Sequence, residues 1–119
     1  MPVTFVGRPR VLEKLAKHGL TLTDIDGATR SLPADRLRLS GQVPVGARPS
    51  LVLLCVKSGA TAEAAGELAF ALPAGTAVIS LQNGISNCAA AAQTGPWLNV
   101  LAGMVPYNVA EIGPGAFHR

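Results

Sequence analysis

Residues 51–84 read LVLLCVKSGATAEAAGELAFALPAGTAVISLQNG, and this stretch decides the fold. Six consecutive apolar residues at 51–56 predict a strand of a parallel sheet that is covered on both faces. A helix is predicted next, because small and apolar residues recur at helical spacing: Thr61, Ala65, Leu68, Ala69 and Leu72. Ser58 is expected to cap this helix and Pro73 to end it. Residues 76–81 predict a second strand, so the stretch forms a βαβ unit.

Polar residues follow three of the predicted strands. Arg8 follows a short strand at 3–6, Lys57 follows the strand at 51–56, and Asn83 follows the strand at 76–81. Ligands of open α/β sheets bind beyond the carboxyl ends of the strands. The three residues together therefore predict a dinucleotide site.

Each of these residues has its own chemistry. An arginine such as Arg8, after the second strand of a dinucleotide fold, pairs with the 2′-phosphate of NADP, where an acidic residue would bind NAD. Lys57 can donate to ribose hydroxyls or phosphate oxygens, and Asn83 offers a neutral donor and acceptor. Taken singly, a basic residue after a strand is usually a solvated charge, and Asn-Gly is usually only a turn. Their shared topology favours the site.

The rest of the chain is predicted from local signals. Alternating residues at 20–24 and 28–32 flank Asp26-Gly27, which predicts a β-hairpin. The other expected elements are a strand at 3–6, a helix at 9–18, a strand at 36–39, a helix at 86–93, a strand at 98–101 and a turn at 113–115.

Bulk composition excludes several classes of function. The net charge of +3 comes mostly from scattered arginines, and the five aromatic residues do not alternate with them, so nucleic-acid binding is not expected. The longest apolar run has six residues, so no membrane span is expected, and without a signal-peptide pattern the chain is interpreted as cytoplasmic. Cys55 and Cys88 are interpreted as small buried residues of a strand and a helix, with no metal site.

The sequence has no Gly-x-Gly-x-x-Gly motif, although a dinucleotide fold uses that turn to bind the pyrophosphate. The predicted fold class is therefore α/β: a Rossmann-like parallel sheet, incomplete because the first strand and the glycine-rich turn are absent, with a small β-hairpin insertion. In the strand order 3-2-1-4-5-6, the missing strand lies between the strands at 3–6 and 51–56. Two apolar sheet edges are then exposed, and we expect self-association through them.

Four segments carry a resemblance to a known family: VGRPR at 6–10, LLCVKS at 53–58, SLQNGI at 80–85 and GPGAFH at 113–118. Together they resemble ketopantoate reductase (2-dehydropantoate 2-reductase), and the spacing of the strand-lysine to Leu-Gln-Asn-Gly is the most specific feature. The resemblance covers residues 1–119 as an internal part of that family's N-terminal NADP-binding domain. It implies NADPH-dependent reduction of 2-dehydropantoate, a small 2-oxoacid, to pantoate in pantothenate synthesis.

The resemblance also implies roles for single residues. Arg8 matches the contact to the 2′-phosphate, Lys57 the lysine near the nicotinamide ribose, and Asn83 the asparagine that touches cofactor and substrate. Val109 falls where the family makes a backbone contact to the cofactor. The family's catalytic lysine belongs to a helical C-terminal domain that residues 1–119 do not include, so these residues alone are expected to be inactive. Two alternatives stay open: a fragment of another NADP-dependent 2-oxoacid reductase, and a non-catalytic NADP(H)-binding remnant.

Overall fold

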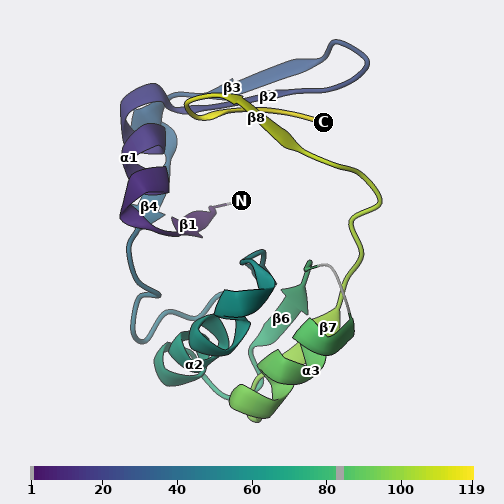
Figure 1. Cartoon of the computed structure of the whole chain (residues 1–119). Helices are drawn as coiled ribbons and strands as arrows, with labels where there is room; N and C mark the ends of the chain where they lie inside the picture. Colours follow the sequence, from purple (N-terminus) through teal and green to yellow (C-terminus); the bar gives the residue numbers. More distant parts are fainter. Residues whose placement is uncertain (1, 83–84) are drawn as a thin grey trace. The chain divides into compact units, whose positions relative to one another are not determined.

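The structure is a computed structural model that describes residues 2–82 and 85–119. The chain has an α/β fold with parallel strands, as the sequence predicts, and divides into two compact units (Figure 1). Unit 1 combines Met1–Gln42 with Pro106–Arg119, and unit 2 is Val43–Val105. Among the helices described, none is both long enough and apolar enough to cross a membrane.

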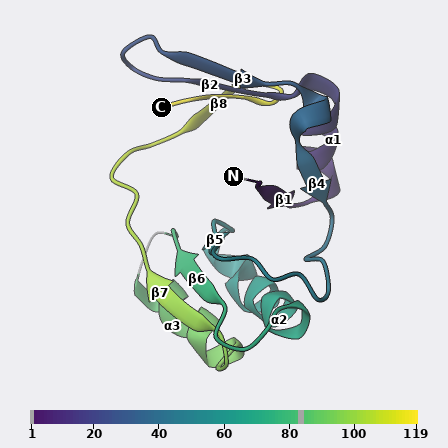
Figure 2. The same ribbon diagram turned by 180° about the vertical axis from the view of Figure 1, so that it is seen from behind.

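Unit 2 contains the predicted βαβ unit and continues it by one more strand. Three parallel strands form its sheet in the order β5-β6-β7. Its elements are β5 (Val52–Leu54), the 3₁₀ turn η2 (Ser58–Ala60), α2 (Thr61–Ala71), β6 (Ala77–Ser80), α3 (Ile85–Thr94) and β7 (Asn99–Ala102). The two helices lie side by side behind the strands in Figure 2.

The core of unit 2 lies between this sheet and the two helices. All five residues of the predicted apolar stripe are buried, and Thr61 and Ala65 are each only 1% exposed. The four apolar residues of the stripe pack with Leu54 and Val78 of the sheet, with Ala91 of α3 and with Leu98 before β7. The helical periodicity of residues 61–72 therefore identified the buried face correctly.

The sheet of unit 2 is covered on one face by its own helices, so the prediction of a strand at 51–56 buried on both faces is wrong for this unit. Leu54 is 4% exposed, whereas Leu53 is 56% exposed and its neighbour two strands away, Leu101, is 49% exposed. Both βαβ connections run in the same direction across the sheet. Because such connections are right-handed, α2 and α3 lie on the same face. Figure 2 looks onto the other face, which we call the open face.

Two further predictions in this region are wrong. Ser58 does not cap the α-helix, because η2 occupies residues 58–60 and moves the helix start to Thr61; the Ser58 hydroxyl instead accepts a hydrogen bond from Asn87 Nδ2. Cys55 is not a buried strand residue, because β5 ends at Leu54 and leaves it exposed. Cys88 does lie in α3, where it is half-buried.

In unit 1, one short strand precedes the first helix and another follows it, and the two strands pair in parallel. Strand β1 (Thr4–Val6) pairs with β4 (Arg38–Ser40), and α1 (Pro9–His18) follows β1, while a short 3₁₀ turn, η1 (Ala34–Arg36), precedes β4. The predicted bounds of α1 are confirmed: proline, whose φ suits a first turn, begins it, and Gly19 ends it at φ 72°. Leu15 is the buried residue of this helix.

The predicted hairpin is confirmed and extended. Strands β2 (Leu20–Thr23) and β3 (Thr29–Leu32) are antiparallel, and Gly27 in their turn has a φ of 85°. The C-terminal segment adds a second hairpin, β8 (Ala110–Gly113) and β9 (Ala116–His118), and β9 pairs with β2 in parallel. The result is a four-stranded sheet in the order β3-β2-β9-β8, in which only the first hairpin and the turn at 113–115 were expected from the sequence.

Two glycines meet where this sheet joins the end of α1. Gly115 has a φ of 71°, and its carbonyl accepts a hydrogen bond of 2.8 Å from the Thr21 amide. A Cβ atom at Gly115 would collide with the carbonyl oxygen of Gly19, and one at Gly19 would lie 2.6 Å from the carbonyl oxygen of Leu32. Both positions therefore require glycine for two reasons, the left-handed backbone and the close approach.

An ion pair attaches the last residue of the chain to the first hairpin. Asp24 Oδ1 accepts a hydrogen bond of 2.9 Å from Arg119 Nε, and Asp24 Oδ2 lies 2.6 Å from an Arg119 terminal nitrogen. The Arg119 guanidinium also lies 5.0 Å from the centre of the Tyr107 ring. The hydrogen bond from Arg119, followed by one from the Ile25 amide, lowers the pKa of the Asp24 carboxyl below its ordinary value of 3.8.

A substitution at Asp24 should therefore have an effect on stability that depends on pH. Because the folded-state pKa is lowered, the carboxylate stabilises unit 1 above about pH 3.8, and this contribution disappears as the pH falls through the lower folded value. We expect Asp24→Asn to lower the melting midpoint slightly at pH 7 and low salt. Melting curves of both proteins should converge once the pH falls below the lowered folded-state pKa of Asp24, or in about 1 M salt, where such pairs are screened. A difference that persisted under both conditions would contradict an electrostatic origin.

Candidate functional site

A hollow of about 320 Å³ lies beyond the carboxyl ends of β5 and β6. It is lined by Cys55, Val56, Lys57, Ser58, Leu81 and Gln82. Open α/β sheets bind ligands in this location. The geometry within unit 2 therefore matches the position that the sequence assigned to a ligand site.

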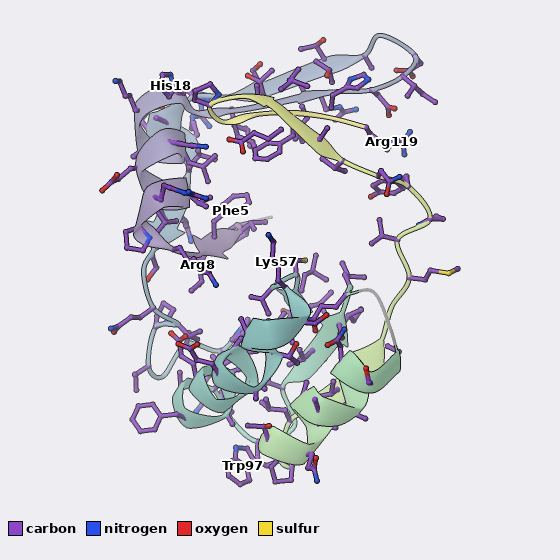
Figure 3. All side chains as sticks on the ribbon, viewed as in Figure 1. Phe5, Arg8, His18, Lys57, Trp97 and Arg119 are labelled. Carbon is purple, nitrogen blue, oxygen red and sulfur yellow. The ribbon has the colours of Figure 1, made fainter. Side chains whose placement is uncertain are left out.

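Lys57 is the cationic group of this hollow. It precedes η2 with an extended backbone (φ −65°, ψ 150°), and its carbonyl accepts a hydrogen bond of 2.9 Å from the Ala60 amide. Figure 3 shows its side chain projecting from this loop, away from the strands and helices of unit 2. In the part of the chain that the structure describes, no carboxylate forms an ion pair with Lys57. Its charge is therefore available to an anionic or hydroxyl-bearing ligand.

Arg8 lies in unit 1, directly between β1 and α1 (Figure 3). Its backbone is extended (φ −70°, ψ 148°), and its carbonyl accepts hydrogen bonds from the amides of Val11 and Leu12 in the first turn of α1. The residue is exposed, and within residues 2–82 and 85–119 no carboxylate pairs with it. Arg8 thus stands after a strand and at the start of a helix, as the sequence predicts.

The other two predicted site residues are Asn83 and Val109. Asn83 lies outside the described residues. Val109 directly precedes β8 in unit 1 and is 54% exposed. Arg8 and Val109 thus belong to unit 1, and Lys57 belongs to unit 2.

Cys55 lies in the hollow beside Lys57 but is poorly suited to nucleophilic chemistry. Although the residue as a whole is exposed, desolvation raises the pKa of its thiol, and the thiolate is the reactive form. The described residues also contain no cluster of three or more His, Cys, Asp and Glu side chains that could bind a metal ion.

Gln82 is the residue of this site that sequence reasoning missed. Its carboxamide spans from the end of β6 to the loop after β5, with a hydrogen bond of 2.7 Å from Nε2 to the Val56 carbonyl. The only sequence signal was its place between Leu81 and Asn83, where a polar residue directly follows a buried strand. That signal does not tell whether such a side chain points to solvent or across the sheet.

The fold is Rossmann-like, and its hollow lies at the carboxyl edge of a parallel sheet. The family profile described as ketopantoate reductase PanE/ApbA matches residues 1–119. The chain therefore belongs to the ketopantoate reductase family. A curated relative, the 2-dehydropantoate 2-reductase of Halobacterium salinarum, is 35% identical over 114 residues, which make up 95% of this chain and 36% of the relative.

Solved structures agree with this assignment. The 2-dehydropantoate 2-reductase of Geobacter metallireducens matches 98% of the chain at 27% identity with a TM-score of 0.76. A PanE/ApbA family ketopantoate reductase of Ralstonia eutropha matches 98% at 29% identity with a TM-score of 0.70. A D-mandelate dehydrogenase solved with NADH and anilino(oxo)acetate shares the fold, with a TM-score of 0.77 at 19% identity. The chain spans 37% of the length of each of these three structures.

Proposed function

We propose that this chain is the cofactor-binding part of an NADPH-dependent reductase that converts 2-dehydropantoate to pantoate, in pantothenate synthesis. The observation that carries the proposal is Lys57 beside a hollow at the carboxyl ends of two parallel strands, in a chain of the ketopantoate reductase family. In this proposal Arg8 binds the 2′-phosphate and Lys57 the nicotinamide ribose. Asn83 contacts cofactor and substrate, and Val109 makes a backbone contact to the cofactor.

The residues of the hollow fit one part of such a cofactor. A volume of about 320 Å³ is at the lower end of the range for small-molecule sites, roughly 300–1,000 Å³. Lys57 offers three donors for ribose or phosphate oxygens, and Leu81 offers an apolar wall. When bound, the nicotinamide supplies the hydride that reduces the ketone carbon. No catalytic residue is proposed within residues 1–119, so this polypeptide is expected to bind cofactor without turning over substrate.

Cofactor titration tests the proposal. We expect residues 1–119 to bind NADPH weakly and more tightly than NADH, with NMR amide shifts concentrated around residues 55–58 and 81–82. Lys57→Ala should weaken NADPH binding about tenfold, as expected for loss of one charged hydrogen-bonding partner. Lys17→Ala, which removes the same charge from the exposed surface of α1, is the matched control and should leave binding unchanged. Shifts elsewhere, or equal effects of both substitutions, would contradict the proposed site.

Two other functions remain candidates: a reductase of another 2-oxoacid and a non-catalytic remnant. The same titration distinguishes the remnant from the proposed reductase. The fold is shared with a D-mandelate dehydrogenase solved with NADH, so the fold alone does not choose between NADPH and NADH, or between ketopantoate and another 2-oxoacid. A non-catalytic remnant would bind both cofactors equally or not at all. Choice among 2-oxoacid substrates needs turnover assays on a protein that also contains the helical domain.

We also propose that the isolated chain self-associates. The open face of the unit 2 sheet presents apolar side chains in register, since Leu53, Ile79 and Leu101 align across the three strands. Beside them, β5 is an edge strand of this sheet, with unpaired backbone groups on its outer side. Exposed apolar surface combined with a free edge favours association between copies.

Sedimentation should therefore show species larger than a monomer at about 100 μM. We expect Leu53→Lys, which places a charge on the open face within edge strand β5, to shift the population towards monomer. Val45→Lys is the matched control, because Val45 is 75% exposed in a loop of the same unit, and it should change nothing. A monodisperse wild-type monomer with a cooperative melting transition would refute self-association.

A further inference from the structure

A single side chain connects the ends of two strands at the candidate site. Gln82 Nε2 donates hydrogen bonds of 2.7 Å to the Val56 carbonyl and 2.7 Å to Thr61 Oγ1, and Gln82 Oε1 accepts one of 3.0 Å from Ser80 Oγ. These contacts determine the orientation of the carboxamide, because the reversed amide would place its oxygen against the Val56 carbonyl oxygen. Gln82 thereby joins β6, the loop after β5 and the start of α2.

The connection continues through further hydroxyl and amide groups. Thr61 Oγ1 donates to Asn87 Oδ1 at 3.3 Å, and Asn87 Nδ2 donates to Ser58 Oγ at 3.1 Å. Thr61 is 1% exposed, Ser80 3% and Asn87 7%, so the Thr61–Asn87 bond is buried, whereas the bond to the exposed Ser58 is only partly buried. We call Gln82, Thr61, Asn87, Ser58 and Ser80 the amide network.

The amide network surrounds one short segment of backbone. It binds the carbonyl of Val56, immediately before Lys57, and the hydroxyl of Ser58, immediately after it. Buried polar groups contribute little net stability compared with apolar packing, but their geometry is specific. The specific geometry here is the orientation of the peptide group that leads into Lys57. Gln82 and Ser58 are the members of the network that also line the hollow, and Gln82 is the one that binds the Val56 carbonyl.

We propose that Gln82 is a positioning residue for cofactor binding, acting through Lys57. This inference rests on the proposed function of the hollow. By fixing the Val56 carbonyl, Gln82 orients the Val56–Lys57 peptide and keeps the Lys57 side chain over the hollow. A lysine has many rotamers and contacts a ligand effectively only from a fixed backbone, so loss of the network lowers affinity without removing the charge.

A double-mutant cycle tests whether Gln82 acts through Lys57. Gln82→Met keeps the length of the side chain and removes its amide. We expect it to weaken NADPH binding about tenfold in the wild-type background and less than twofold in the Lys57→Ala background. Val78→Ala creates a cavity in the buried part of β6 and is the control for general destabilisation. Its effect on NADPH binding should be the same in both backgrounds. Additive effects of Gln82→Met and Lys57→Ala would overturn the inference.

A measurement without cofactor separates this inference from the proposed function. The Ala60 amide donates to the Lys57 carbonyl, and the Asn99 amide donates to the Thr76 carbonyl at the opposite end of the sheet, both at 2.9 Å. In the free protein, Gln82→Met should accelerate hydrogen exchange of the Ala60 amide at least tenfold and leave the Asn99 amide unchanged. Unchanged exchange at Ala60 would overturn the positioning role. Faster exchange at Ala60 in a chain that binds no NADPH would support positioning and refute the proposed function.

Discussion

Replacing Arg8 by alanine is expected to weaken NADPH binding about tenfold or more while leaving NADH binding unchanged, because the lost contact involves only the 2′-phosphate. The structure supports this role by leaving the guanidinium exposed and without a carboxylate partner among the residues described. The positive end of the α1 dipole lies next to it and adds to the attraction for an anion. NMR titrations with the two cofactors at low salt measure both affinities.

Two substitutions, one at Arg10 and one at Arg8 itself, are the controls for this result. Arg10→Ala removes the same charge from the first turn of α1 and should reduce NADPH affinity by less than about twofold, through the general field alone. Arg8→Lys should recover only part of the affinity, because an ammonium group cannot form the paired hydrogen bonds of a guanidinium with a phosphate. Equal losses for NADPH and NADH on Arg8→Ala would exclude Arg8 as the residue that reads the 2′-phosphate.

Substituting Gly115 with alanine is expected to destabilise unit 1 by about 3 kcal/mol or more. The left-handed backbone alone costs about 1–2 kcal/mol for a residue with a Cβ atom. The added methyl group would also collide with the Gly19 carbonyl oxygen, so the backbone would have to move at the junction of β2, β9 and α1. Denaturant unfolding measures the loss, and hydrogen exchange in β2 and β9 should accelerate with it.

Gly27→Ala is the control that separates these two causes. Gly27 has a φ of 85°, but nothing lies within 4 Å of the position its Cβ atom would occupy. The substitution should therefore cost only the backbone term of about 1–2 kcal/mol. If Gly27→Ala and Gly115→Ala destabilised the protein equally, the close approach of Gly115 to Gly19 would have no energetic importance.

The elements that could be predicted from the sequence are those specified by neighbouring residues. Pro9 and Gly19 mark the two ends of α1, and Asp26-Gly27 forms the turn of the first hairpin. The small residues of α2 recur on one face, which gave its buried side correctly. Each of these signals lies within one element or one turn, where short-range physics is sufficient.

The features that could not be predicted depend on residues far apart in the chain. Strand β9 pairs with β2 across about 95 residues, and nothing in Ala116–His118 identifies that partner. The open face of the unit 2 sheet also follows from the direction of two crossovers rather than from the six apolar residues at 51–56. For the site, the sequence could name Lys57 by its place after a strand. The role of Gln82 requires the cross-sheet distance to the Val56 carbonyl.

The pairing of β2 with β9 also bears on how this polypeptide is made. A ribosome synthesises Leu20–Thr23 first, then the whole of Val43–Val105, and Ala116–His118 only after both. Unit 2 can begin to fold while it emerges, but the four-stranded sheet lacks its inner strand β9 until residues 116–118 have also emerged. During that interval β2 offers an unsatisfied edge to other nascent chains or to a chaperone. The order of synthesis therefore makes unit 1 the part of the nascent protein that is most prone to misassembly and aggregation.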